Sequence, residues 1–86
     1  MMNENTKKAI RSYCEWQKEE LVMYEDIDKP FFLTMANEKV GKQYHLYRVD
    51  FCMNIDHIRS YSESSTAKAV FLLLKHTGIN YIEYPF

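Results

Sequence analysis

The feature that most constrains the fold is a stretch with a two-residue period, residues 43–53. Successive side chains of a β-strand point to opposite faces, so this alternation predicts a strand with an apolar odd-numbered face and a mixed even-numbered face. The odd-numbered positions are His45, Tyr47, Val49, Phe51 and Met53. Residues 31–36 form a second short apolar run, bounded by Pro30 and Asn37, and the polar segment that follows contains Gly41. The two runs therefore predict an antiparallel hairpin.

Two further segments have helical periodicity. Apolar positions recur every three or four residues over residues 5–25, which predicts one helix that ends before Pro30. Residues 64–76 predict a second helix, which begins at Ser64-Ser65-Thr66 and is followed by Gly78. Residues 79–84 indicate a closing strand, whereas residues 55–61 fit a strand extension, a separate strand or a helical turn.

A chain of 86 residues has room for one small domain. The expected fold is a single α+β domain over residues 1–86, in the order α-β-β-α-β. Its sheet is mostly antiparallel and has three strands, or four if residues 55–61 pair, and both helices are expected on one face. The aromatic content of 15% supplies a sufficient core. Cys14 and Cys52 are too few for a disulfide framework, so we expect two free thiols in a reducing compartment.

Composition argues against several classes of function. With 11 Lys+Arg against 12 Asp+Glu, the chain lacks the positive charge of a dedicated nucleic-acid binder. Two glycines leave no room for a Gly-rich phosphate loop. No segment approaches the roughly 20 apolar residues of a membrane span, and the polar N-terminal residues lack the apolar core of a signal peptide. We therefore expect a cytoplasmic protein with no membrane partner.

The sequence contains no recognised catalytic or metal-binding motif. Its cysteines and histidines form no local signature of a nucleophile and its base. His45, Cys52, Asp56 and His57 lack the closely spaced ligand pairs of structural zinc sites. Nothing is expected to bury the carboxylates of the first helix, so they are predicted to form a solvated face. We accordingly expect no enzyme, no catalytic residues, no cofactor and no metal.

A protein-binding surface is the strongest remaining signal. On the predicted first helix, Trp16 and Met23 fall together, away from the core stripe, and both residue types are enriched at protein interfaces. Acidic residues flank them, although a wide apolar face of this kind also suits a core. The expected partner-binding residues are Trp16, Met23, Glu15, Glu19, Glu20, Asp26 and Asp28.

The expected function is therefore a small non-enzymatic inhibitor or regulatory adaptor of the phage or mobile-element type. It would block a partner protein, such as a nucleic-acid-processing enzyme, by its shape and negative charge. The alternative is a nucleic-acid-associated regulator that uses Tyr44, Leu46 and Arg48 on the mixed strand face, although the charge balance disfavours direct binding. The apolar surface of the second helix also leaves a homodimer open.

Overall fold

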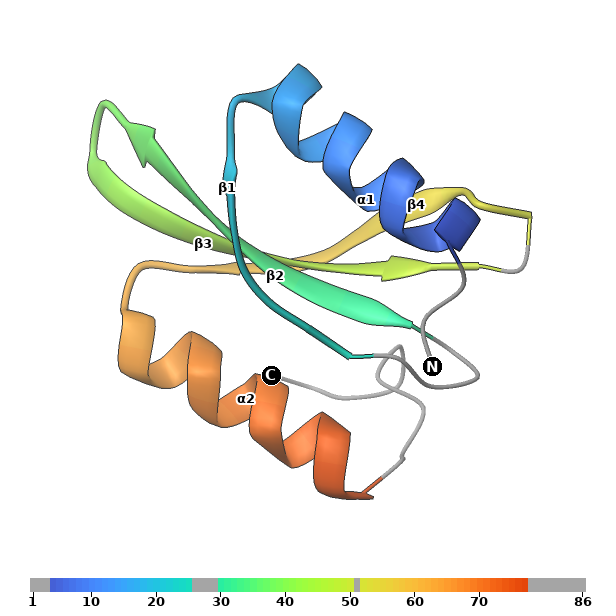
Figure 1. The fold of residues 1–86 in the computed structure, drawn as a ribbon. Coiled ribbons are helices and arrows are strands. Elements are labelled where there is room, and N and C mark those ends of the chain that lie inside the picture. Colours follow the sequence, from blue (N-terminus) through green and yellow to red (C-terminus); the bar gives the residue numbers. More distant parts are fainter. Residues whose placement is uncertain (1–3, 26–29, 51, 78–86) are drawn as a thin grey trace.

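The computed structural model describes residues 4–25, 30–50 and 52–77, which form two helices and a four-stranded sheet (Figure 1). The elements are α1 (Glu4–Gln17), β1 (Glu20–Glu25), β2 (Phe31–Glu38), β3 (Gly41–Val49), β4 (Ile55–Tyr61) and α2 (Ser64–Thr77). All neighbouring strands pair antiparallel, in the spatial order β1-β2-β3-β4. The predicted small α+β fold with two helices and an antiparallel sheet is confirmed. Residues 55–61 form a separate strand, one of the alternatives left open, whereas the strand over residues 20–25 was not predicted.

The element order differs from the prediction, because the described residues follow the order α-β-β-β-β-α. The predicted helix over residues 5–25 is two elements: α1 ends at Gln17, and the chain then enters β1. Lys18 closes the helix in the left-handed region with φ 57, and the Glu19 N–H donates to the Cys14 carbonyl at 2.9 Å. Glycine usually occupies this position, since other residues lose roughly 1–2 kcal/mol there. The predicted closing strand and Gly78 lie outside the described residues.

The two helices cover opposite faces of the sheet, so the prediction that both lie on one face is wrong (Figure 1). Adjacent residues of β2 show the reason. Phe31 and Leu33 pack with α2, whereas Phe32 packs with α1 on the other side. A strand that is covered on both faces has a continuous buried run rather than an alternating one, and the first four residues of β2 are all buried.

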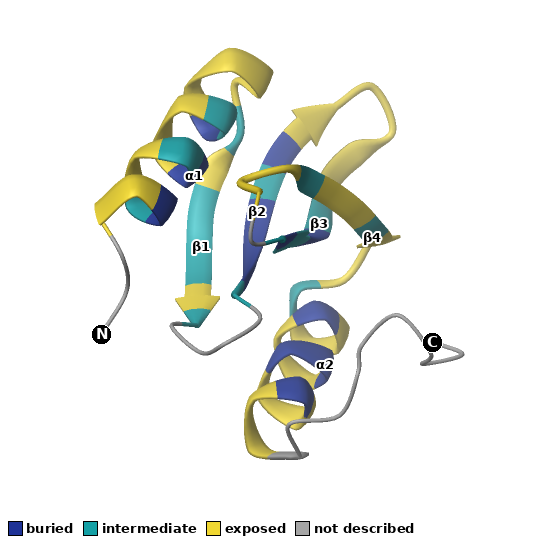
Figure 2. Ribbon diagram, turned by 90° about the vertical axis from the view of Figure 1, so that its right-hand side faces the viewer, coloured by how far each residue is buried: buried dark blue, intermediate teal, exposed yellow. Residues whose placement is uncertain are grey.

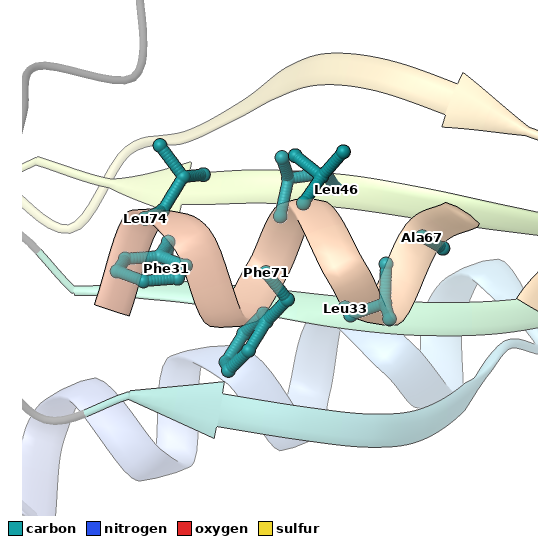
Figure 3. Packing of buried hydrophobic residues seen from close by; sticks show 7 residues of the cluster. Phe31, Leu33, Leu46, Ala67, Phe71 and Leu74 are labelled. Atoms are coloured by element: carbon teal, nitrogen blue, oxygen red, sulfur yellow. The ribbon is translucent and has the colours of Figure 1, made fainter. Parts of the chain in front are cut away.

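The core cluster under α2 joins this helix to β2 and β3 (Figure 3). Its buried members are Phe31, Leu33, Leu46, Ala67, Val70, Phe71 and Leu74. The rings of Phe31 and Phe71 lie with centroids 4.8 Å apart, which places two large aromatic side chains at its centre. Leu72 and Leu73 on the same helix are 42% and 40% exposed. The homodimer stays a prediction.

The second core cluster lies under α1. Ile10 and Cys14 of the helix pack against Phe32, Tyr47 and Val49 of the sheet. Tyr47 and Val49 on the odd-numbered face of β3 are therefore core, as predicted, but the predicted strand over residues 43–53 ends at Val49, and Met53 is exposed. Phe51 lies outside the described residues. The even-numbered face is also partly core, because Leu46 lies under α2. Figure 2 shows buried residues on both helices and along β2. Within the described residues, no helix is long and apolar enough to cross a membrane.

Candidate functional site

Trp16 lies near the C-terminal end of α1, and 75% of its surface is exposed. The ring of Tyr13 contacts it edge-on, with centroids 6.1 Å apart. Tyr13 in turn packs against the buried ring of Tyr47 at 4.9 Å. The indole is therefore supported from the core on one side and open to solvent on the other.

A shallow, wide-open groove of about 390 Å³ lies between α1 and the start of β4, next to Trp16. We call it the anchor groove; its lining residues are Ala9, Ser12, Tyr13, Trp16, Met53, Asn54 and Ile55. Met53 is 36% exposed. Trp16 of α1 and Met53 of the turn between β3 and β4 thus both reach solvent at this groove.

The turn between β3 and β4 holds Met53 in place. The carboxylate of Asp50 accepts hydrogen bonds from the backbone N–H groups of Asn54 and Cys52, both at 2.9 Å. These bonds, that of Asn54 foremost, hold the pKa of Asp50 below its ordinary value. The backbone of Met53 adopts φ 66, a left-handed conformation that residues other than glycine rarely take. The Met53 sulfur accepts a hydrogen bond from the Thr6 hydroxyl at 3.6 Å. The methionine is thereby positioned before any partner arrives.

Met23 does not share this surface. It lies in β1 and packs against the α2 cluster, on the opposite side of the sheet from α1. The β1–β2 register shifts between Leu21 and Met23, which turns Met23 to that side. The predicted juxtaposition of Trp16 and Met23 is therefore wrong, because it assumed helical geometry beyond Gln17.

The structure also separates the acidic residues that were predicted to surround Trp16. Glu15 and Glu20 are exposed, but Glu19 turns inward. Its Oε1 accepts hydrogen bonds from the Thr34 hydroxyl at 2.6 Å and the Tyr47 hydroxyl at 2.8 Å. Burial raises the pKa of Tyr47, and the hydrogen bonds of Tyr47 with Tyr13 and Glu19 raise it further. Glu19 is therefore engaged inside the protein rather than on the rim. Asp26 and Asp28 lie outside the described residues.

The alternative nucleic-acid face is largely covered by α2. Leu46 is 2% exposed, and Tyr44 packs against the same core cluster. Arg48 is paired with Asp56, with Nη2 and Oδ2 3.0 Å apart. Bases stack only on open aromatic faces, so this arrangement does not form the predicted platform.

A group of polar side chains lies on the α1 face of the sheet, where β2, β3 and β4 run side by side (Figure 1). The Nδ1 atom of His45 lies 2.7 Å from the Ser60 Oγ, and its Nε2 lies 2.9 Å from the Glu38 Oε2. The Nε2 atom of His57 lies 2.8 Å from the same Ser60 Oγ. We call these four residues the serine–histidine cluster. No local sequence pattern indicates this cluster, because its members come from three different strands.

A bulge in β4 assembles the serine–histidine cluster. Tyr47 pairs with His57, but His45 pairs with Ser60, so β4 has one residue more than β3 over this interval. In a regular strand, residues 57 and 60 would point to opposite faces. The extra residue brings both to the α1 face, where the imidazole centroids of His45 and His57 are 5.5 Å apart. Burial, followed by the proximity of His45, lowers the pKa of His57.

Within residues 4–25, 30–50 and 52–77, no group of three or more His, Cys, Asp or Glu side chains is arranged to hold a metal ion. Cys14 is buried and Cys52 is exposed, and both are free thiols. No protein-family model, curated protein or solved structure matches this chain. The function is therefore inferred from the anchor groove and the serine–histidine cluster themselves.

Proposed function

We propose that this chain is a small protein-binding domain, an inhibitor or regulatory adaptor, that docks its partner on the anchor groove. The observation that carries the proposal is the 75% exposure of Trp16 beside a second exposed apolar residue, Met53. Tryptophan is the residue type most enriched among interface hot spots, and a hot-spot truncation costs about 2 kcal/mol or more of binding free energy.

The groove also has the preorganisation that a docking site needs. Tyr13 supports the Trp16 ring, and the Asp50 turn fixes Met53. A side chain that is already held in its bound position loses little conformational entropy on binding. The partner would insert an apolar side chain between the two anchors.

Exposed carboxylates would also increase the rate at which a basic partner associates. Of the predicted acidic residues, Glu15 and Glu20 are exposed in the described structure. A partner with a basic rim, as nucleic-acid-processing enzymes have, would associate faster for this reason. Inhibition itself would be steric, since the bound domain would cover the functional site of its partner.

The test is affinity capture from host lysate with the tagged full chain, followed by mass spectrometry. We expect a stoichiometric partner that the wild type retains and Trp16→Ala loses, with affinity lower by about 30-fold, the equivalent of 2 kcal/mol. Tyr24→Ala is the matched control, because Tyr24 is a 47% exposed aromatic residue on β1, outside the anchor groove.

Circular dichroism establishes that the Trp16→Ala variant is folded, which its exposure predicts. Equal retention of the partner by Trp16→Ala and wild type would contradict the proposal. So would equal losses for Trp16→Ala and Tyr24→Ala, recovery of nucleic acid alone, or the absence of any stoichiometric partner.

A further inference from the structure

The serine–histidine cluster has the hydrogen-bond order of an activated serine. An ionised carboxylate only accepts hydrogen bonds, so the His45 Nε2 that faces Glu38 at 2.9 Å carries the proton. In the neutral form of His45, the form that can act as a base, Nδ1 is then an acceptor, and the Ser60 hydroxyl at 2.7 Å donates to it. A hydroxyl that donates to a base, itself oriented by an acid, is the arrangement used in nucleophilic catalysis.

We propose that Ser60 is a nucleophile toward carboxylic esters, with His45 as its general base and Glu38 as a positioning residue. This activity is separate from partner docking on the anchor groove. The residues come from three strands of one sheet, so the backbone hydrogen bonds of the sheet fix their separation. Ser60 and His57 are exposed, which gives a substrate access to the Ser60 oxygen.

In the first step, the Ser60 Oγ attacks the carbonyl carbon of the ester while its proton passes to the His45 Nδ1. The bond between that carbon and the leaving oxygen then breaks, and the leaving alcohol takes the proton from His45. The acyl group remains on Ser60. A water molecule next gives a proton to His45 and attacks the acyl carbon, which releases the carboxylic acid and returns the proton to Ser60.

His57 is a second positioning residue for Ser60. Because the Ser60 hydroxyl donates to His45, its oxygen accepts a hydrogen bond from the His57 Nε2–H at 2.8 Å. This hydrogen bond, together with the one to His45, fixes the direction of the Ser60 hydroxyl.

The experiment exposes the full chain to p-nitrophenyl acetate and, separately, to diisopropyl fluorophosphate. We expect a burst of p-nitrophenol of about one equivalent per chain. We also expect a covalent adduct that tandem mass spectrometry places on Ser60. Ser60→Ala should abolish burst and adduct, and His45→Gln should slow labelling by about 100-fold. Ser62→Ala is the matched control, because Ser62 is exposed and only two residues away.

Several outcomes would overturn the proposal. Free imidazoles also hydrolyse p-nitrophenyl acetate, so turnover that persists in Ser60→Ala would assign the reaction to histidine alone. Equal labelling of Ser60 and Ser62 would show that Ser60 is not activated. Wild-type labelling that is as fast in concentrated urea as in buffer would show that the folded arrangement contributes nothing, and this comparison does not depend on a variant that folds.

The positioning role of Glu38 has a spectroscopic readout. The imidazole nitrogen chemical shifts of His45 report which ring nitrogen carries the proton. We expect a fixed Nε2–H tautomer in the wild type, a mixture in Glu38→Gln, and labelling of Ser60 about tenfold slower in that variant. Unchanged shifts and an unchanged labelling rate in Glu38→Gln would remove Glu38 from the mechanism.

Discussion

Glu19 tests the structure more sharply than any other acidic residue, because sequence and structure assign it opposite roles. The sequence places it in an acidic rim with Glu20, whereas the structure directs only Glu19 into the protein, where it accepts hydrogen bonds from Thr34 and Tyr47. The informative comparison is therefore Glu19→Ala against Glu20→Ala. The two substitutions remove the same groups from adjacent positions in the chain.

The magnitude follows from the two donors that Glu19→Ala leaves without their acceptor. Thr34 is 0% exposed and Tyr47 is 3% exposed, so water has little access to either residue. An unsatisfied buried donor costs about 1–3 kcal/mol, so we expect the free energy of unfolding to fall by about 2–6 kcal/mol. For Glu20→Ala at an exposed position, we expect a change of less than about 0.5 kcal/mol.

Urea unfolding followed by far-UV circular dichroism measures the difference. With a denaturant slope of about 1 kcal/mol per molar urea for a chain of this size, the Glu19→Ala midpoint should fall by about 2 M or more. Tyr47→Phe should lower the free energy of unfolding less in the Glu19→Ala background than in the wild type, because it removes the hydroxyl that Glu19→Ala leaves without an acceptor. Equal midpoints for Glu19→Ala and Glu20→Ala, or strictly additive effects with Tyr47→Phe, would refute this reasoning.

Two further predictions concern titration. Burial, with a smaller contribution from Glu19, raises the pKa of Cys14 from 9.0 to about 11, whereas Cys52 is exposed. A disulfide reagent such as dithionitrobenzoate should therefore titrate one thiol rapidly and the second only as the chain unfolds; two rapid equivalents would contradict this. Burial and the neighbouring His45 lower the pKa of His57 from 6.5, while Glu19 opposes this shift. The unfolded chain therefore takes up that proton first, and stability should fall as the pH drops through about 6.5 toward the lower folded value. Urea midpoints measured across this range should fall less in His57→Gln, and equal slopes would contradict the prediction.

The β2–β3 hairpin could be predicted from the sequence because its information is local. Its two strands carry apolar side chains in short runs, and Gly41 follows the turn with φ 111, a conformation that glycine adopts readily. The prediction placed the two helices wrongly because it treated only one face of the hairpin as core. Phe31 and Phe32 are both fully buried, which requires cover on both sides of β2.

The boundary between α1 and β1 could not be predicted, since its stop signal is absent from the sequence. Lys18 takes the left-handed position without being glycine or asparagine. The apolar residues that follow, Leu21 and Tyr24, have a spacing that also continues the helical stripe. Tertiary packing of β1 against β2 decides between the two structures. The predicted site that depended on the longer helix, Trp16 with Met23, was lost for the same reason.

The serine–histidine cluster exists because two apolar residues of β4, three positions apart, are packed on the same face of the sheet. Ile55 packs against the α1 cluster, while Ile58 and Tyr61 both pack against the α2 cluster. Residues three apart fall on opposite faces of a regular strand, so Ile58 and Tyr61 can both reach α2 only if β4 contains an extra residue. The bulge satisfies both contacts, and it also turns Ser60 to the same face as His57. Without it, Arg59 would stand opposite His45. The polar cluster is thus a consequence of apolar packing on the other side of the sheet, which no local pattern around Ser60 reveals.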